Sequence, residues 1–312
     1  MRSCLNLRKQ RERKGEQTGL KVEAECVACI ISRGAAEARE ATTNPALRFR
    51  TMSDLLKMLT KEFKPTAVPA DIGTKRDAVI RRVTGNADPY KRSKRISNEK
   101  AMRLLPYARK LVEEGYNLQD RFKRACLCAI VGNLMEFDIP GHKFTSGSLK
   151  KAFRDAAKDL VIDDTGKIYD LAKKAHTVLY LTDNAGEIVF DTLLVEQLKN
   201  MGLTVTVAVK AGPIINDATL EDAELSGMCK AADKVITTGT DSVGLAMNKV
   251  STEFREVYDC VDMVFAKGMG YAETLTEYKL KKPHVLLFRT KCVPVANFFG
   301  VSREKNVAKL MP

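Results

Sequence analysis

Apolar residues in the first half of the chain recur at three- and four-residue spacings, which is the pattern of amphipathic helices. The clearest examples are segments 52–63, 97–114 and 118–136. Proline and glycine residues separate such segments, and we find no clear strand pattern in this half. The pattern therefore predicts a helical domain over residues 23–172, preceded by a flexible basic extension over residues 1–22.

From residue 176 onward, short runs of β-forming residues alternate with longer amphipathic segments. Strands are expected at 177–181, 203–209, 234–237, 262–265 and 284–288. Helices are expected at about 187–201, 218–229, 244–258 and 272–281, with a last one after Cys292. Strands that alternate with helices form right-handed crossovers, which give a parallel sheet with helices on both faces. We therefore expect an α/β protein in which residues 173–312 form a Rossmann-like domain.

Polar residues gather at the positions that follow these strands. Asp183 and Asn184 follow the first strand, Asp217 lies in the loop after the second, and Lys267 follows the fourth. Other candidates at strand ends are Lys210, Gly239, Asp241, Gly268, Gly270, Lys291 and Cys292. Because ligands of open α/β sheets bind beyond the carboxyl ends of the strands, we expect these residues to share one crevice.

The residue types in this group suit a metal–phosphate site. The oxygens of Asp183, Asn184 and Asp217 are the hard ligands that Mg²⁺ and similar cations prefer. Lys267 and the main-chain amides of residues 268–270 are donors suited to phosphoryl oxygens. A cation at such a site polarises phosphorus and activates water, which is phosphatase chemistry. An Asp or Asn after one strand is more often a helix cap, but recurrence at successive strand ends favours a site.

The net charge of +13 invites a nucleic-acid interpretation, but its distribution does not support one. The basic surplus lies in the N-terminal half, with much of it in the first fourteen positions, whereas residues 170–312 are nearly neutral. We find no zinc-finger spacing, no basic stripe interleaved with aromatic residues and no RNA-binding signature. The positive charge is better explained by attraction of small phosphorylated molecules, and nucleic acid is not expected as a partner.

No segment of the sequence has the character of a membrane span. The longest charge-free apolar stretch, residues 125–135, is far shorter than the roughly 20 residues that a spanning helix needs. The eight cysteines are scattered, without the density of a disulfide scaffold. We therefore expect a cytoplasmic protein without a membrane partner. The sequence carries no signal for an oligomeric state.

Several segments resemble the damage-control phosphatase family, also known as domain-of-unknown-function family 89. Those in the second half are Leu-Thr-Asp-Asn-Ala-Gly-Glu-Ile-Val-Phe-Asp (181–191), Pro-Ile-Ile-Asn-Asp-Ala-Thr (213–219), Ala-Lys-Gly-Met-Gly (266–270) and Lys-Cys-Val-Pro-Val-Ala (291–296). Those in the first half are Glu-Cys-Val-Ala-Cys (25–29), Thr-Gly-Asn-Ala-Asp-Pro-Tyr (84–90) and Gly132-Asn133, which resemble the microbial subfamily with a C-x-x-C motif. The motifs occur in order over nearly the whole chain.

The resemblance implies a metal-dependent phosphatase that acts on sugar phosphates or damaged phosphometabolites. It places a divalent cation, such as Mg²⁺, Mn²⁺, Co²⁺ or Ni²⁺, on Asp183, Asn184 and Asp217. It also suggests Lys267 as a phosphate ligand. These are expectations for the structure to test.

One position departs from the family pattern. The family usually has Lys-Gly-x-x-Asn-Tyr, whereas Tyr271 and Ala272 follow Gly270 in this chain. The absent asparagine puts its hydrogen bond to the substrate in doubt. The expected metal ligands are unaffected.

Five further residues are weaker candidates. Glu187 either caps the helix that follows it or contacts a water on the metal. Asn133 lies in an apolar segment, so it needs a buried partner and is a candidate for substrate binding. Asp88, Lys94 and Asn98 either reach over the site from the helical domain or lie on the surface.

Cys26 and Cys29 are the pair with C-x-x-C spacing. They are interpreted as small core residues, as a redox pair, or as part of a second or structural metal site. A zinc site needs about two more ligands, which Cys126, Cys128 or Cys292 would have to supply.

Two other functions stay open at this stage. One is a nucleotide- or metabolite-binding protein without catalysis, with Cys26 and Cys29 as a metal clip. The other is a carboxyl methyltransferase, an activity proposed in the family, but the first strand is not followed by a glycine-rich loop for S-adenosylmethionine. The segment Gly-Met-Gly-Tyr-Ala-Glu (268–273) is only a weak match to a dinucleotide fingerprint.

Overall fold

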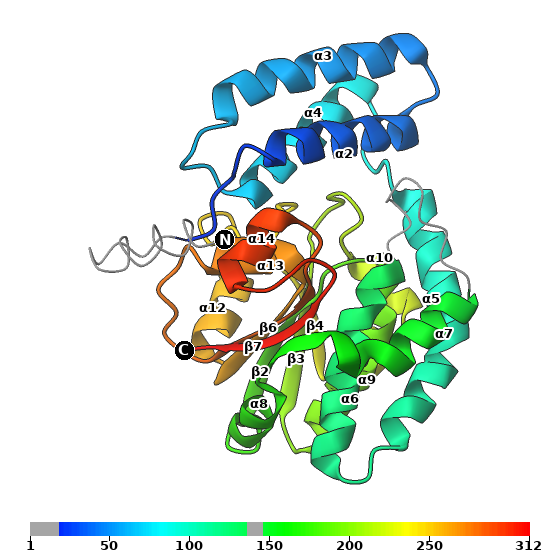
Figure 1. Cartoon of the computed structure of the whole chain (residues 1–312), viewed down its shortest axis with the longest axis vertical. Coiled ribbons are helices and arrows are strands. Elements are labelled where there is room, and N and C mark those ends of the chain that lie inside the picture. The colour runs from blue at the N-terminus through cyan, green and yellow to red at the C-terminus, as the bar shows by residue number, and fades with distance from the viewer. Residues whose placement is uncertain (1–18, 136–145) are drawn as a thin grey trace.

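The computed structural model describes residues 19–135 and 146–312 (Figure 1). Residues 1–18, most of the expected flexible extension, lie outside the described part of the chain. The residues that follow are packed onto the protein. Leu20 and Val22 are buried, and Lys21 forms an ion pair with Glu277.

Three helices form a layer at the top of the molecule in Figure 1, namely α2 (Cys26–Ala41), α3 (Pro45–Glu62) and α4 (Pro69–Thr84). Asn44 starts α3, because its side-chain oxygen accepts hydrogen bonds from the amides of Ala46 and Leu47. The layer has a small core of its own, formed by Val22, Ile30, Leu55, Leu59 and Ile72. The helix predicted at 52–63 overlaps α3, which begins earlier, at Pro45, and ends at Glu62.

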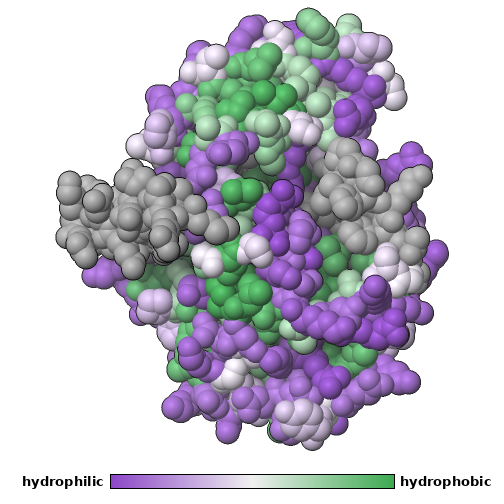
Figure 2. Space-filling model, in the orientation of Figure 1, coloured by the Kyte–Doolittle hydropathy of each residue, from purple (hydrophilic) through white to green (hydrophobic). Residues whose placement is uncertain are grey.

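The outer side of this layer is partly apolar. Phe49 and Leu56 of α3 are 79% and 50% exposed. Figure 2 shows apolar residues over the upper layer, whereas the lower part of the same face is mostly hydrophilic. In the described ranges, no helix has the length and apolar character needed to cross a membrane.

A second group of helices lies along one face of a β-sheet. It comprises α5 (Lys91–Glu113), α6 (Leu118–Val131), η1 (Gly132–Met135), α7 (Ser146–Asp155), η2 (Ala156–Asp159) and α8 (Thr165–Ala172). The last turns of α6 are apolar on all sides because α9 (Glu187–Asn200) and the sheet cover them. The domain boundary expected at residues 172 and 173 stays a prediction, and the contacts of α5 and α6 with α9 cross it.

The sheet has seven strands in the order β1-β7-β6-β5-β2-β3-β4. Their bounds are Leu160–Asp163 (β1), Thr177–Leu181 (β2), Thr204–Val209 (β3), Lys234–Thr237 (β4), Met263–Lys267 (β5), His284–Arg289 (β6) and Asn306–Met311 (β7). Neighbouring strands are parallel, except that β6 and β7 are antiparallel. The α/β class is confirmed, with a mixed, mostly parallel sheet.

Side chains of the central strand β2 alternate between two cores. Val178 and Tyr180 join the core under α5, α6 and α9. Leu179 and Leu181 join the core on the other face, which α12 (Thr252–Cys260), α13 (Gly268–Leu275) and α14 (Val293–Phe299) cover. Burial on both faces explains why this strand is a continuous apolar run, and it confirms the expected helices on both sides.

Two strands at one edge of the sheet, β1 and β7, were not predicted from the sequence pattern. β1 lies before residue 172, so the prediction of no strand in that half is wrong. Its four residues alternate between half-buried and exposed, and a segment this short is not distinguishable from helix by periodicity. β7 follows α14, where the prediction ended in a helix.

Three predicted helices have different limits in the structure. The helix expected at 244–258 begins only at Thr252, because the side chain of Ser251 accepts from the amide of Phe254 and caps it. The one expected at 272–281 begins earlier, at Gly268. The one expected at 218–229 is divided into α10 (Leu220–Leu225) and α11 (Met228–Ala231) by Gly227, whose φ is 79°.

Candidate active site

Two loops at the carboxyl edge of the sheet bring Asp183, Asn184 and Asp217 together. The first loop follows β2 and the second follows β3, and these strands are parallel neighbours. An isolated β-bridge pairs Asn184 with Asp217. The amide of Ala218 also donates to the carbonyl oxygen of Asp183 at 2.8 Å. Backbone contacts therefore fix the three expected metal ligands relative to one another.

The Asp183 carboxylate is part of a hydrogen-bonded cluster of side chains. Its Oδ2 accepts from Nδ2 of Asn184 at 2.9 Å and from Nδ2 of Asn133 at 3.2 Å. The same two amides donate to Oε2 of Glu187, at 3.2 Å and 2.7 Å respectively. The structure thus brings Asn133, a candidate for substrate binding, into direct contact with the expected metal ligands. It does the same for Glu187, a candidate for contact with a metal-bound water.

Asn133 offers an oxygen atom to this cluster. The residue is 4% exposed, and its Oδ1 has no hydrogen-bond partner among the described residues. Because a buried polar atom without a partner is costly, this oxygen is suited to accept a ligand. A cation or a donor group of a substrate would satisfy it.

The carboxylates repel one another when no cation is bound. Burial raises the pKa of Asp183 well above its usual range, and the charges of Glu187 and Asp217 raise it further. Burial also raises the pKa of Asp217 to about 6, although the charge of Lys210 opposes the shift. A nearby positive ion favours the ionised form of a carboxylate, so a divalent cation would relieve both effects.

The available atoms fit a hard cation that is bound through oxygen. Asp183 and Asp217 supply carboxylates, and Asn184 and Asn133 supply side-chain amides. Within residues 19–135 and 146–312, no three His, Cys, Asp or Glu side chains form a metal-binding group. A cation here would therefore need amide oxygens or water in addition to the two carboxylates.

Gly268 lies directly against the Asp183 carboxylate. Its φ is +84°, and a Cβ at this position would lie 1.9 Å from Oδ2 of Asp183. We expect Gly268→Ala to displace that carboxylate and to lower kcat/KM about a hundredfold, because small misplacements at a reacting centre have effects of this size. Gly85→Ala is the matched control, since Gly85 has a φ of +71° with nothing within 4 Å. Equal losses of activity in the two variants would contradict the steric explanation.

Lys267 does not face the crevice, contrary to the expected phosphate contact. Its side chain is 0% exposed, and its ammonium lies 2.5 Å from Oε1 of Glu187 and 2.9 Å from Oδ1 of Asp191. It also donates to the carbonyl oxygen of Ala129 at 2.8 Å. These three acceptors match the three N–H groups of the lysine. Burial opposes the charge, but Asp191 and Glu187 outweigh it and raise the pKa of Lys267.

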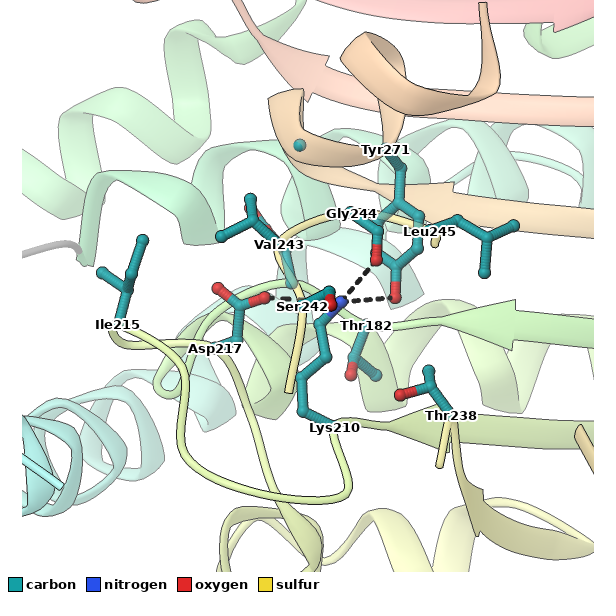
Figure 3. Close-up of polar contacts among 12 residues, drawn as sticks. Thr182, Lys210, Ile215, Asp217, Thr238, Ser242, Val243, Gly244, Leu245 and Tyr271 are labelled. Carbon is teal, nitrogen blue, oxygen red and sulfur yellow. Dashed lines mark hydrogen bonds and ion pairs between the residues drawn. The ribbon is translucent and has the colours of Figure 1, made fainter. Parts of the chain in front are cut away.

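Lys210 is the lysine that lies beside an expected metal ligand (Figure 3). Its ammonium is 3.6 Å from Oδ2 of Asp217. It donates to the carbonyl oxygen of Gly244 at 2.6 Å and to the hydroxyl of Tyr271 at 3.4 Å. Burial opposes its charge, but Tyr271 and Asp217 raise the pKa of Lys210. The position of Lys210 directly after a strand made it a candidate in the sequence. No local pattern indicated that Tyr271 contacts this lysine.

The expected candidates on α5 support the site through its loops. Oδ1 of Asn98 accepts from the amide of Gly186 at 2.6 Å, and Nδ2 of Asn98 donates to Asp222 at 2.8 Å. Lys94 pairs with Asp88 at 3.1 Å. The structure thus connects Asn98 to the loop that carries Asp183 and Asn184, while Lys94 and Asp88 contact each other.

Asp77 of α4 has a similar role that the sequence pattern does not signal. Its Oδ1 accepts from the amide of Ile215 at 3.1 Å, across a separation of 138 residues. Ile215 has a φ of 47°, which is unusual for a β-branched residue. Arg81 pairs with both Asp77 and Asp241. The helix α4 therefore holds the loop that carries Asp217.

A cavity of about 420 Å³ lies between the α2–α4 layer and the edge of the sheet. The polar cluster contributes Asn133, Asp183, Asn184 and Asp217 to its lining. Its cationic lining residues are Arg33, Arg76, Lys291 and Arg303. Burial lowers the pKa of Lys291 to about 7, and the charge of Arg33 adds to this effect. The cavity thus brings basic side chains together with the expected metal ligands, and Glu25 and Glu273 also line it.

Three thiols line the same cavity, those of Cys26, Cys29 and Cys292. Cys126 and Cys128 are instead buried within α6. Burial raises the pKa of Cys292 to about 11, so its thiol is protonated at neutral pH. The second or structural metal site on Cys26 and Cys29 stays a prediction, with Cys292 as the cysteine that the fold brings to the same cavity.

The chain is similar to known proteins over nearly its whole length. The sequence matches the damage-control phosphatase ARMT1-like domain over residues 22–307. It is 35% identical over 297 residues to a damage-control phosphatase of Archaeoglobus fulgidus. That match covers 94% of this chain and 100% of the relative. It is also 35% identical over 286 residues to the damage-control phosphatase PH1575 of Pyrococcus horikoshii, with 91% and 96% covered. An uncharacterised protein of Methanocaldococcus jannaschii is 36% identical over 293 residues, with 92% and 95% covered.

A solved structure shares the fold. The crystal structure of a family-89 protein from Pyrococcus horikoshii matches this chain with a TM-score of 0.82 and 34% identity, and covers 93% of this chain and 98% of its own. The resemblance noted in the sequence motifs is therefore confirmed by matches over nearly the full length. The chain belongs to the damage-control phosphatase family with the ARMT1-like domain.

Proposed function

We propose that this phosphatase hydrolyses phosphomonoesters of small metabolites, such as sugar phosphates or damaged phosphometabolites, with a divalent cation held by Asp183, Asn184 and Asp217. The bridge between the β2 and β3 loops is the main support, because it places two carboxylates and an amide on the wall of one cavity. Two of the similar proteins are damage-control phosphatases, which supports the same reaction class.

A bound divalent cation would polarise the phosphoryl group and lower the pKa of a water molecule. The side chains of the chain itself hold this site in place. Asn133 and Asn184 fix the Asp183 carboxylate, and Lys267 fixes Glu187 from the opposite side. Glu187 adds negative charge next to the cation site, which strengthens the attraction for a cation.

We propose a revised set of phosphate contacts. Met269 and Gly270 line the cavity, and the first turn of a helix has amides without partners inside the helix, which suit phosphoryl oxygens. Arg33 adds positive charge to the same lining, and Lys291 adds it in part, because its pKa is about 7. Lys267 contributes indirectly, through the position of Glu187.

Phosphate release is expected to depend on a divalent cation. When the protein is incubated with para-nitrophenyl phosphate, phosphate should be released in the presence of Mg²⁺, Mn²⁺, Co²⁺ or Ni²⁺. Excess chelator should stop the release, because the cation offsets the charge of the carboxylates and the phosphate. Asp217→Ala should stay inactive at every cation concentration. A panel of sugar phosphates tests the substrate class.

Two outcomes of that experiment would change the proposal. Full activity in excess chelator would contradict the role of the cation. Cation binding without phosphate release from any phosphomonoester would favour the non-catalytic binding alternative. Methyl transfer from S-adenosylmethionine, assayed in parallel, would support the methyltransferase alternative.

The proposed partner is a small phosphorylated metabolite, and the proposed location is the cytoplasm. The location is supported by the scattered cysteines, which lack the density of a disulfide scaffold.

A further inference from the structure

Lys210 is held by groups that restrain it from two sides. It directly follows β3, and its side chain is 1% exposed. Its ammonium donates to the carbonyl oxygen of Gly244 and the hydroxyl of Tyr271, and it lies 4.8 Å from the centroid of the Tyr271 ring. Figure 3 shows the ammonium between these two groups and Asp217. Two of its polar contacts are therefore with neutral acceptors, and the third is the ion pair with Asp217.

The Asp217 carboxylate forms a long ion pair with this ammonium. The distance from Nζ to Oδ2 is 3.6 Å, whereas a charge-assisted hydrogen bond is typically about 2.8 Å long. One carboxylate oxygen of Asp217 faces Lys210 and the other points away from it (Figure 3). The ammonium thus balances the charge of Asp217 from a distance, and the carboxylate keeps the capacity to bind a cation.

We propose that Tyr271 is a positioning residue for cation binding, because its hydroxyl, together with the Gly244 carbonyl, holds the Lys210 ammonium back from Asp217. The inference rests on the proposed function, in which Asp217 is a metal ligand. Without the hydroxyl, the ammonium keeps the Gly244 carbonyl, and Asp217 is the group towards which it can move to form a shorter ion pair. A cation would then have to displace that ion pair before it could bind.

Tyr271 is also a residue in which this chain departs from the usual family pattern. It stands at the position where the resemblance noted in the sequence motifs implies an asparagine, in Lys-Gly-x-x-Asn-Tyr. Asparagine is too short to reproduce both the ring beside the ammonium and the hydroxyl that accepts from it. The restraint on Lys210 is therefore a property of the tyrosine in this chain.

Tyr271→Phe tests the inference, because it keeps the ring and removes only the hydroxyl. The probe is Mn²⁺ alone, titrated by calorimetry into the full-length, metal-free protein. We expect the Kd for Mn²⁺ to rise about tenfold, which corresponds to the loss of one hydrogen bond to a charged group. The Mn²⁺ concentration that gives half-maximal phosphatase activity should rise in parallel.

Tyr258→Phe is the matched control. The Tyr258 hydroxyl also forms a hydrogen bond, to Nε2 of His284 at 2.8 Å, but this partly buried contact involves neither Lys210 nor Asp217. This variant should lose a similar amount of stability and should leave the Kd for Mn²⁺ unchanged. Melting temperatures in chelator compare the two losses of stability directly.

A double-mutant cycle separates positioning from packing. In a Lys210→Met background no ammonium is present, so Tyr271→Phe should no longer change the Kd for Mn²⁺. If Lys210→Met does not fold, Lys210→Gln serves the same purpose, because its amide keeps a donor for Gly244 and carries no charge.

Two results would overturn the inference while the proposed function survives. One is an unchanged Kd for Mn²⁺ in Tyr271→Phe. The other is the same weakening in the presence and absence of Lys210, which would mean that the hydroxyl acts through packing. Absence of Mn²⁺ binding by the wild-type protein would instead overturn the proposed metal site and this inference together.

Discussion

Asp183→Asn is expected to abolish phosphatase activity and to raise the melting temperature of the metal-free protein at neutral pH. Activity should fall at least about a hundredfold, because even changes around metal ligands cost ten- to a hundredfold. The gain in stability has an electrostatic cause, since burial and the charges of Glu187 and Asp217 disfavour an ionised Asp183. Asparagine keeps an oxygen that can accept from Asn133.

The stability gain should depend on pH in one direction. Asp183 has a higher pKa in the folded protein than in the unfolded chain, where the pKa is near 3.8. Between these two pKa values the folded protein keeps a proton that the unfolded chain releases. Wild-type stability therefore falls as pH rises through this window. The variant lacks this group, so its advantage should be largest at neutral pH and should vanish near the unfolded pKa.

Calorimetric melting in chelator, from about pH 4 to about pH 8, measures this difference. Asp170→Asn is the matched control, because it makes the same chemical change at an exposed position on α8. Saturating Mn²⁺ should reverse the order of the melting temperatures, since a ligand stabilises the protein that binds it more tightly. An Asp183→Asn protein that melts below the wild type at neutral pH in chelator would contradict this account.

The central strands could be predicted because both of their faces are buried. β2 is buried from its second residue to its end, and β6 is buried over its first five residues. Such strands appear in the sequence as continuous apolar runs. β1 lies at the edge of the sheet, and in β7 only the first three residues are buried. Their mixed patterns resemble those of loops and short helices.

The proposed metal ligands could be predicted from the sequence, because their positions directly after neighbouring strands are enough to bring them together. Parallel strands end at one edge of the sheet, so residues that follow β2 and β3 must be neighbours. The direction of a side chain at a strand end requires more information. Met263 and Phe265 of β5 belong to the core under α6 and α9, so Lys267 faces the same helices by the alternation of a strand. The predicted strand ended at residue 265, and for that reason Lys267 was expected in the crevice.

Contacts between distant segments were beyond the reach of the sequence pattern. Asn98 and Gly186 are 88 residues apart, and Tyr271 and Lys210 are 61 residues apart. Each pair depends on how whole elements pack, and no local periodicity encodes that arrangement. The loops therefore could be predicted to carry the ligands, but the residues that hold those loops could not.

Lys267→Met is expected to destabilise the folded protein severely. A lysine that only bound phosphate would instead affect substrate binding without loss of stability. Loss of the ammonium leaves Glu187 and Asp191 without their shared partner, and both side chains are at most 1% exposed. Breaking a buried ion pair by removal of one partner costs about 3–5 kcal/mol. For a protein of this size, that loss lowers the melting temperature by on the order of 10 °C.

Relief of the unpaired charge should restore part of this stability. Lys267→Met combined with Asp191→Asn should melt higher than Lys267→Met alone. The deficit should also narrow as pH falls towards about 6. Burial raises the pKa of Asp191 to about 6 in the wild type and loss of Lys267 raises it further, so above about pH 6 only the folded variant takes up this proton. Lys234→Met, which removes an exposed ion pair with Glu253, should change the melting temperature little. A Lys267→Met protein with wild-type melting and about tenfold lower kcat/KM would instead support direct contact between Lys267 and the phosphate.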